Sequence, residues 1–239
     1  IGNGSNLLVG DGGIRGIVLE IGKQMSEISI EGTKITAGAG AMLSAIASKA
    51  AAQELTGLEF ASGIPGSLGG AVVMNAGAYG GEMKDVLTEV TVLTPEGTFL
   101  TLPVAELDLS YRHSIIPERG YLVVSAVLEL HPGKAEEIRA VMEDLKEKRV
   151  SKQPLEYPSA GSTFKRPEGY FAGKLIQDAG LRGFQVGGAQ VSEKHCGFVI
   201  NRDHATSADI CNLMNQVSEI VFEKFGVRLE AEVKKIGEF

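Results

Sequence analysis

Glycine is the residue that most constrains how this chain can fold, because its glycines gather in three segments. The chain has 31 glycines in 239 residues, concentrated in residues 2–16, 57–81 and 180–188. Glycine lacks a Cβ, so it adopts positive φ readily and allows a ligand or another backbone to approach closely. We therefore predict loops in these segments and regard them as candidates for contacting a cofactor. For any single glycine, an ordinary tight turn is the simpler interpretation.

Apolar periodicity and alanine content predict three helices, over residues 41–54, 134–149 and 207–225. Thr206 and Asp209 have the spacing of a capping box in front of the last helix, and Gly226 is placed to end it. No segment reaches the roughly 18 uninterrupted apolar residues that a membrane span requires, and no secretory signal is visible. We expect a soluble protein without a membrane partner.

Strand-like runs fill the first half of the chain and recur near its end. They cover residues 14–20, 28–30, 34–37, 86–94, 98–102, 121–131, 189–192, 197–201 and 229–236. The turn at 95–97 predicts a hairpin. Runs of strands with interspersed helices indicate an α+β fold. We place a domain boundary near residue 150, where a helix ends in a polar, proline-containing stretch, so that residues 1–150 and 151–239 form two domains.

The charge balance narrows the class of partner. The formal net charge is −7, which argues against nucleic acid, a partner that favours a basic surface. Local cations and backbone N–H groups can still bind a small anionic ligand. Cys196 and Cys211 are too few for a disulfide framework and are predicted to be reduced core residues. The histidines show no ligand-like spacing, so no metal site is expected.

The two richest glycine loops differ from the common nucleotide-binding patterns. The first has no crossover helix after it, and neither contains the Gly-Lys-Ser/Thr of a Walker loop. Two loops of bare backbone can donate N–H groups to both sides of a pyrophosphate, which points to a dinucleotide such as FAD. The candidate cofactor-binding residues are Gly2, Asn3, Gly4, Ser5, Asn6, Gly63, Ile64, Pro65, Gly66, Ser67, Gly69, Gly70, Asn75, Ala76 and Gly77.

Three further segments carry polar residues that suit chemistry: 111–114, 159–167 and 229–233. Each also has a plain structural interpretation. Arg112 could form a surface ion pair, Ser162 could be a turn hydroxyl, and Glu232 could face solvent from a strand.

Taken together, these segments resemble the UDP-N-acetylenolpyruvoylglucosamine reductase family, in the shorter subtype that lacks an extra substrate-capping loop. The matching motifs occur in the family's order along nearly the whole chain. They are Gly-Asn-Gly-Ser-Asn at 2–6, Gly-Ile-Pro-Gly-Ser at 63–67, Tyr-Arg-His-Ser at 111–114, Ser-Lys-Gln-Pro at 151–154, Ser-Ala-Gly-Ser-Thr-Phe-Lys-Arg-Pro at 159–167, Ala-Gly-Lys-Leu-Ile at 172–176, Lys-His-Cys-Gly-Phe-Val-Ile-Asn at 194–201 and Leu-Glu-Ala-Glu-Val at 229–233.

The resemblance implies a cytoplasmic enzyme that uses FAD and NADPH to reduce an enolpyruvyl ether on a UDP-amino-sugar in peptidoglycan precursor synthesis. Arg112 matches the arginine that stabilises the enolate-like charge, and Ser162 matches the proton donor. Glu232 matches a glutamate that shares this stabilisation, a role that requires a protonated carboxyl or a proton relay because a bare carboxylate would repel the dianion.

The resemblance also implies a substrate site. Lys152 and Arg166 suit the UDP diphosphate, because ammonium and guanidinium groups both bind phosphate oxygens. Lys165 is a further candidate substrate-binding residue. Tyr111 is expected to pack near the flavin or the substrate. His195 is left open between a functional role and a structural one in which the backbone satisfies its ring. A monomer is expected.

The resemblance leaves one gap, since family members begin with roughly sixty further residues of the FAD domain. The N-terminal portion of that domain is therefore expected to be missing here. Two other readings compete. One is an FAD-dependent oxidase with the same type of cofactor domain, and the other is a non-enzymatic module that binds a nucleotide sugar.

Overall fold

The computed structural model describes all 239 residues, and they form two compact units. Unit 1 comprises Ile1–Gly4 and Leu19–Arg149, and unit 2 comprises Ser5–Val18 and Val150–Phe239. The sequence-based division kept residues 5–18 with the first domain. In the structure this segment belongs to unit 2, because β1 (Leu7–Val9) pairs in parallel with β14 (Lys234–Ile236). The assignment of cofactor binding and substrate binding to two domains stays a prediction.

Unit 1 is built on a five-stranded sheet with the order β2-β3-β9-β7-β8. Every neighbouring pair in it is antiparallel. Its strands are β2 (Ile28–Glu31), β3 (Lys34–Gly38), β7 (Leu87–Leu93), β8 (Phe99–Pro103) and β9 (Leu122–Glu129). β7 and β8 form the hairpin predicted around residues 95–97. Short elements complete the unit: β4 (Leu55–Thr56), β5 (Gly77–Ala78), β6 (Gly81–Glu82), β10 (His131–Pro132), η1 (Lys23–Met25), η2 (Glu59–Ala61), η3 (Met83–Asp85) and η4 (Val104–Glu106).

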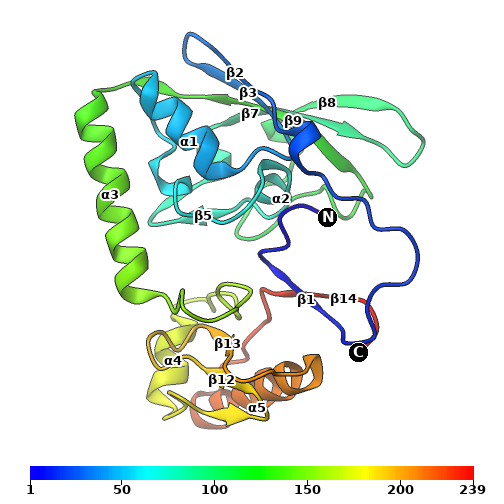
Figure 1. Cartoon of the computed structure of the whole chain (residues 1–239), viewed down its shortest axis with the longest axis vertical. Helices are drawn as coiled ribbons and strands as arrows, with labels where there is room; N and C mark the ends of the chain where they lie inside the picture. Colours follow the sequence, from blue (N-terminus) through cyan, green and yellow to red (C-terminus); the bar gives the residue numbers. More distant parts are fainter. The chain divides into compact units, whose positions relative to one another are not determined.

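Two helices of unit 1, α1 (Leu43–Ala52) and α2 (Leu68–Val73), lie on one face of this sheet (Figure 1). α1 buries residues on one stripe, including Leu43, Ile46 and Ala50, as a packed amphipathic helix does. α2 falls where the sequence predicted a glycine loop. Its Leu68 and Val72 are fully buried, and this packing outweighs the poor helix propensity of its two glycines.

The remaining helices are α3 (Ala135–Lys152), α4 (Ala172–Asp178) and α5 (Ser207–Phe225). α3 and α5, like α1, confirm the three predicted helices. Thr206 and Asp209 form the expected capping box, and Gly226 ends α5 with a φ of 70°. In unit 2, α5 packs on the antiparallel sheet β11-β12-β13, whose strands are Gln185–Val186, Ala189–Val191 and Val199–Asn201.

Two predicted strands differ in the structure. Residues 14–20 form no strand, since no other segment pairs with them, and Ile17 is 91% exposed. The strand predicted over 229–236 shortens to β14. The first half of the predicted strand contacts the segment after Ser162 instead. Lys165 N–H donates to the Glu230 carbonyl, and Ala231 forms only an isolated bridge with Phe164.

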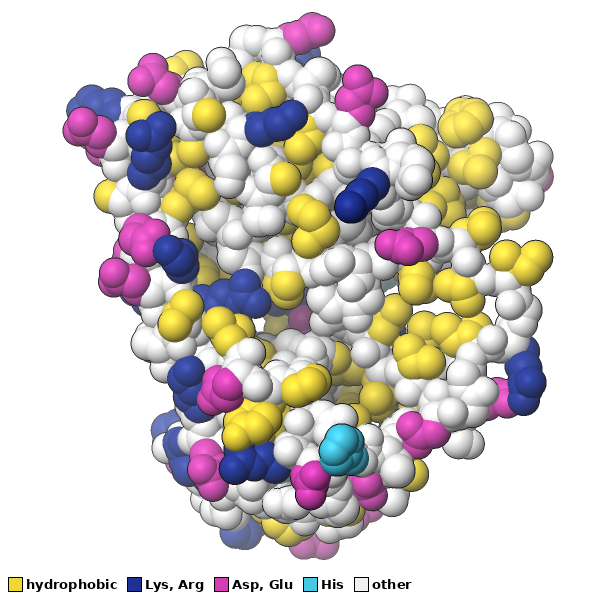
Figure 2. Space-filling view, in the orientation of Figure 1, with side chains coloured by type: hydrophobic (Ala, Val, Ile, Leu, Met, Phe, Trp, Pro, Cys, Tyr) yellow, Lys and Arg dark blue, Asp and Glu magenta, His cyan; other side chains and the backbone are white.

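The surface offers no sign of a strongly basic face in the view of Figure 2, where Lys and Arg side chains alternate with Asp and Glu. None of the helices combines the length and the apolar character needed to cross a bilayer.

Candidate functional site

The two glycine loops predicted to face a cofactor meet within unit 1. The Asn3 side-chain Nδ2 donates to the Pro65 carbonyl at 2.7 Å. A Cβ added to Gly2 would lie 2.4 Å from Ser67 Oγ, a distance that real Cβ atoms do not reach. The structure therefore brings these distant loops together, and a side chain at position 2 would require the Ser67 hydroxyl to move.

The second loop is fixed against the chain that leads into α1. Leu43 N–H donates to the Gly66 carbonyl at 3.0 Å, and Leu68 N–H donates to the Ala41 carbonyl at 2.8 Å. The N–H groups of Gly66 and Ser67 donate to no atom of the chain. Two adjacent backbone donors, held in place beside a glycine loop, suit a phosphate oxygen.

Other predicted cofactor-binding groups already have partners in the protein. Gly69 N–H donates to the Ala39 carbonyl at 2.8 Å. The Gly63 carbonyl accepts a hydrogen bond from the Arg149 guanidinium, and partial burial lowers the pKa of Arg149. Ile64 and Ala76 use their N–H groups in local turns. Gly70 has space around its Cα, since an added Cβ would meet only Ser67 Oγ at 3.9 Å.

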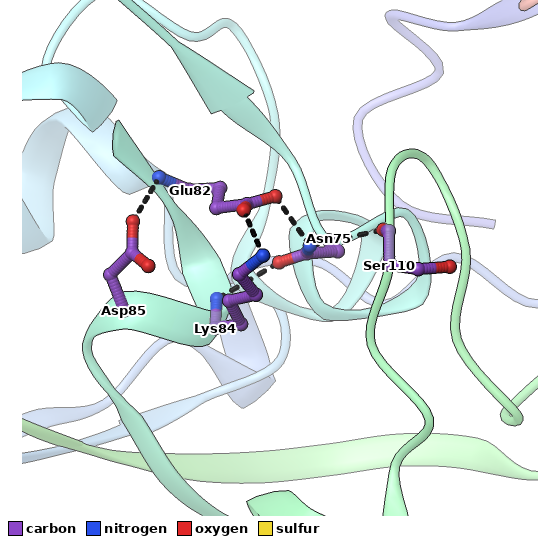
Figure 3. A network of polar contacts seen from close by, with 5 residues as sticks. All are labelled: Asn75, Glu82, Lys84, Asp85 and Ser110. Carbon is purple, nitrogen blue, oxygen red and sulfur yellow. Dashed lines mark hydrogen bonds and ion pairs between the residues drawn. The ribbon is translucent and has the colours of Figure 1, made fainter. Parts of the chain in front are cut away.

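Arg112 lies in a tight turn, and the segment that follows α2 forms hydrogen bonds with this turn. Ser110 and His113 exchange backbone hydrogen bonds at 3.3 and 3.2 Å across this turn. Arg112 has a positive φ of 56°, and its Nη2 donates to the Gly77 carbonyl at 3.1 Å. Its guanidinium carbon lies 4.9 Å from the centroid of the half-exposed Tyr111 ring. Asn75, a predicted cofactor-binding residue, donates a hydrogen bond to the Ser110 carbonyl of the same turn (Figure 3).

Thr163, the residue after Ser162, links this segment to Glu232 within unit 2. Ser162 is exposed, whereas Thr163 and Glu232 are 3% and 9% exposed. Glu232 N–H donates to the Thr163 carbonyl at 2.9 Å. Thr163 in turn donates its N–H to the Gly197 carbonyl at 2.9 Å, and its Oγ1 accepts from Val199 N–H at 2.8 Å.

Asn6, another predicted cofactor-binding residue, contacts this same group. Its Nδ2 donates to the Glu232 carbonyl at 3.1 Å, and its own carbonyl accepts from Lys234 N–H at 2.9 Å. Asn6 and the neighbouring Ser5 belong to unit 2, whereas Gly2, Asn3 and Gly4 belong to unit 1. Asn6 therefore holds the backbone that carries Glu232.

The predicted substrate-binding cations have different surroundings. Lys165 forms an ion pair with Glu230, so part of its charge is used within the protein. The Arg166 guanidinium lies 3.9 Å from the centroid of the exposed Phe171 ring, and its Nε donates to the Tyr170 carbonyl at 3.3 Å. Lys152 is the last residue of α3 and is exposed. Arg166 and Lys152 keep surface that an anionic ligand can reach.

His195 has the structural role that the sequence left open. Its Nδ1 accepts from Gly197 N–H at 3.0 Å, and its ring makes an edge contact with Phe198 at 5.1 Å between centroids. Burial lowers the pKa of His195, and the charges of Lys152 and Arg182 lower it further. A neutral ring that accepts at Nδ1 carries its proton on Nε2. His195 thus supports the Gly197 carbonyl that holds Thr163.

Sequence reasoning missed Thr163 as a connecting residue. It stands inside a recognised motif beside Ser162, but its sequence context gives no sign that it is buried or that Glu232 pairs with it. The roles of Asn6 and Asn75 in contacts within the protein were hidden in the same way, because glycine-rich context alone favours a ligand-binding interpretation.

Comparisons with known families match both parts of the chain. Residues 1–103 match the family described as FAD binding domain. Residues 153–236 match the family described as UDP-N-acetylenolpyruvoylglucosamine reductase, C-terminal domain.

Individual relatives match over the full chain. The UDP-N-acetylenolpyruvoylglucosamine reductase of Agathobacter rectalis is 64% identical over 251 residues, which cover 100% of this chain and 80% of the relative. That of Clostridioides difficile is 54% identical, covering 100% of this chain and 78% of its own length. The crystal structure of UDP-N-acetylenolpyruvylglucosamine reductase from Thermus caldophilus superposes with a TM-score of 0.84 at 36% identity, covering 99% of this chain and 84% of that one.

Proposed function

This chain belongs to the UDP-N-acetylenolpyruvoylglucosamine reductase family, and from that premise we propose that Ser162, Glu232 and Arg112 carry its chemistry. The protein is an FAD-dependent oxidoreductase that uses NADPH to reduce the enolpyruvyl ether of UDP-N-acetylglucosamine enolpyruvate to UDP-N-acetylmuramate, in peptidoglycan precursor synthesis. The observation that carries the residue assignment is the backbone bond between Thr163 and Glu232, which ties Glu232 to the residue that follows Ser162.

The residues of the glycine loops fit FAD. The fit rests on the close approach of Gly2 to Ser67 and on the unused N–H groups of Gly66 and Ser67, which suit the pyrophosphate of a dinucleotide. When bound, FAD supplies the hydride that is added to the enolpyruvyl double bond, having taken it from NADPH. We assign Gly2, Asn3, Gly4, Gly66 and Ser67 to holding it.

Ser162 is proposed as the proton donor. Hydride addition to the terminal carbon of the enolpyruvyl group leaves carbanion character beside the carboxylate, and this basic centre can take a proton even from a weakly acidic hydroxyl. Ser162 is exposed, whereas its neighbour Thr163 is fixed by backbone bonds, so the hydroxyl is placed on a rigid segment. Precise placement is what makes such a weak acid effective.

Arg112 is proposed to stabilise the enolate-like charge, and Glu232 to share this task as a protonated carboxyl or a proton relay. A cation that is already held in place costs little reorganisation when the negative charge develops. The guanidinium of Arg112 is held by the Gly77 carbonyl and the Tyr111 ring. Glu232 is buried, and its backbone is held by Thr163 and Asn6.

The UDP diphosphate is proposed to bind Arg166 and Lys152, with Lys165 as a further cation and Tyr111 packing near the reacting groups. Residues 1–150 are proposed as the FAD-binding part and residues 151–239 as the substrate-binding part, which the two family matches support. Action in the cytoplasm is part of the same proposal.

The first experiment is anaerobic oxidation of NADPH by the FAD-supplemented protein, with and without UDP-N-acetylglucosamine enolpyruvate. We expect oxidation that depends on the substrate. Stoichiometric reduction of FAD that does not respond to the substrate, followed by rapid consumption of oxygen once air is admitted, would favour the oxidase reading instead. Binding of the UDP-sugar without FAD binding or turnover would favour the non-enzymatic module.

Ser162→Ala tests the proton-donor assignment. Reduction of FAD by NADPH should stay within about twofold of the unmodified protein, because Ser162 takes no part in it. Reduction of the enolpyruvyl substrate should slow by roughly 100-fold or more, the usual contribution of a positioned acid. Stopped-flow absorbance measures the two steps separately, and an equal loss in both would refute the assignment.

A further inference from the structure

Asn75 is fully buried, at 0% exposure, directly after α2. Its Nδ2 donates to Glu82 Oε2 at 2.7 Å and to the Ser110 carbonyl at 3.0 Å, while its Oδ1 accepts from Lys84 N–H at 2.9 Å. Figure 3 shows these contacts radiating from the one side chain. An amide has two N–H donors, and both are used here. The side chain therefore has no donor left for FAD, although the sequence suggested it as a cofactor ligand.

The Ser110 carbonyl that Asn75 contacts begins the turn that carries Arg112. This carbonyl also accepts from His113 N–H, the bond that closes the turn. The Arg112 guanidinium donates to the Gly77 carbonyl, and Ser114 Oγ donates to the Val73 carbonyl at 2.7 Å. Residues 73–77 thus hold the turn at its backbone, at its guanidinium and at the residue after it.

The turn needs such external contacts. Arg112 has a φ of 56°, a conformation that costs a residue other than glycine about 1–3 kcal/mol and persists only where the surroundings impose it. Asn75 is suited to impose it because one amide can donate to a carbonyl and a carboxylate while accepting from an N–H. Aspartate at this position would lack both donors and would add a charge beside Glu82.

We propose that Asn75 is a positioning residue for Arg112: it fixes the 110–113 turn so that the guanidinium meets the developing negative charge. The inference rests on the proposed role of Arg112 in the reaction. Asn75 itself contacts neither the substrate nor the cofactor.

The test uses Asn75→Ala in FAD-supplemented protein, alone and combined with Arg112→Ala. Asn75→Ala should slow reduction of the enolpyruvyl substrate by about tenfold to 100-fold, the loss expected when a group moves by roughly 1 Å. The affinity for FAD and the rate of FAD reduction by NADPH should change less than about twofold. In the Arg112→Ala background the further loss should also be under about twofold, because non-additivity marks residues that act together.

Two comparisons separate positioning from general destabilisation. Thr88→Val removes one hydrogen bond, from Thr88 Oγ1 to the Val127 carbonyl, elsewhere in unit 1 and should leave substrate reduction unchanged. The pair Asn75→Asp with Glu82→Gln keeps an amide–carboxylate contact but lacks a donor for the Ser110 carbonyl. This pair preserves most of the network, so it should fold even if Asn75→Ala fails to fold. It should show the same kinetic loss as Asn75→Ala.

Hydrogen exchange gives a readout independent of turnover. The amide of His113 should exchange faster in the Asn75 variants, while Thr88→Val leaves its rate unchanged. A full, multiplicative loss in the Arg112→Ala background, an unchanged exchange rate, or a fall in FAD affinity as large as the kinetic loss would each overturn the inference. If Arg112→Ala alone leaves substrate reduction intact, the proposed role of Arg112 fails, and the exchange rate still decides whether Asn75 holds the turn.

Discussion

At the scale of single residues, the proposed chemistry depends on buried polar side chains that hold exposed ones. Thr163 uses its N–H, its carbonyl and its Oγ1 in hydrogen bonds to two separate segments, one at Gly197 and Val199 and the other at Glu232. The exposed Ser162 precedes Thr163 in the chain, and the buried Glu232 donates its N–H to the Thr163 carbonyl. A reactive hydroxyl on an otherwise mobile loop would spend little time in a productive position, and Thr163 removes that freedom.

Replacement of Thr163 by valine tests this role. Valine has nearly the same shape but cannot accept from Val199 N–H, whose hydrogen bond is buried. A buried donor left without a partner costs about 1–3 kcal/mol. We expect a free energy of unfolding lower by that amount, and slower substrate reduction with unchanged reduction of FAD by NADPH. Thr163→Ser keeps the acceptor and should restore both quantities to near their original values, as measured by urea unfolding and stopped-flow absorbance.

His195 gives unit 2 a pH dependence. Burial lowers its pKa in the folded protein below the ordinary value, which is about 6.5 in the unfolded chain. The unfolded chain therefore takes up the proton first as the pH falls, and stability is lost from about pH 6.5 downward toward the folded pKa. Above that range His195 is neutral in both states and contributes no pH dependence.

The measurement compares urea unfolding at about pH 7.5 and pH 5.5 for the unmodified protein and His195→Asn. The Asn side-chain oxygen replaces the Nδ1 acceptor for Gly197 N–H and does not titrate. We expect the drop in stability between these pH values to be smaller in the variant. Equal drops would show that other groups produce the whole effect.

At the scale of elements, the sequence predicted the long helices because their signals are local. The capping box at Thr206 and the stop at Gly226 lie within or beside α5 and act on its own backbone. Strand predictions depend on partners that the local sequence does not contain. Residues 14–20 have the composition of a strand but no strand pairs with them, and residues 229–233 pair with the segment after Ser162 instead of extending β14.

Gly226 allows a test of an element end in isolation. Its φ is 70°, and an added Cβ would meet no atom within 4 Å. Gly226→Ala should therefore destabilise the protein through backbone strain alone, by about 1–2 kcal/mol. Gly226→Asn is the matched control, because asparagine adopts this conformation more readily, and it should cost less. Urea unfolding measures both, and alanine tolerated as well as asparagine would contradict the strain argument.

At the scale of the whole chain, the sequence supplies the candidate site residues, whose roles stay a prediction, but it does not supply the contacts that hold them. The motifs around Arg112, Ser162 and Glu232 are visible in the sequence, as are the glycine loops. The sequence does not show that the first glycine loop divides between the two units, with Asn3 bonded to Pro65 and Asn6 bonded to Glu232. Asn6 pairs with a residue 226 positions away and Asn3 with one 62 positions away, so no local pattern reveals the division.

The contact between Asp11 and Ser207 shows how unit 2 joins the two ends of the chain. Asp11 Oδ2 accepts from Ser207 N–H at 2.8 Å and from its Oγ at 2.9 Å, and Asp11 N–H donates to the same Oγ at 3.1 Å. Ser207 is the first residue of α5 and is buried. A carboxylate at a helix N-terminus is also favoured by the helix dipole.

Asp11→Ala should therefore lower the free energy of unfolding by about 1–2 kcal/mol, since it removes a charged acceptor from a buried helix start. Asp11→Asn keeps an acceptor oxygen and loses only the contribution of the charge. Its free energy of unfolding should therefore fall by less than half as much. Hydrogen exchange should show faster exchange in the first turn of α5 and in β14, because β1, which pairs with β14, lies directly before Asp11. Exchange in Asp11→Ala as slow as in the unmodified protein would mean that β1 and β14 hold the N-terminal segment in place without this contact.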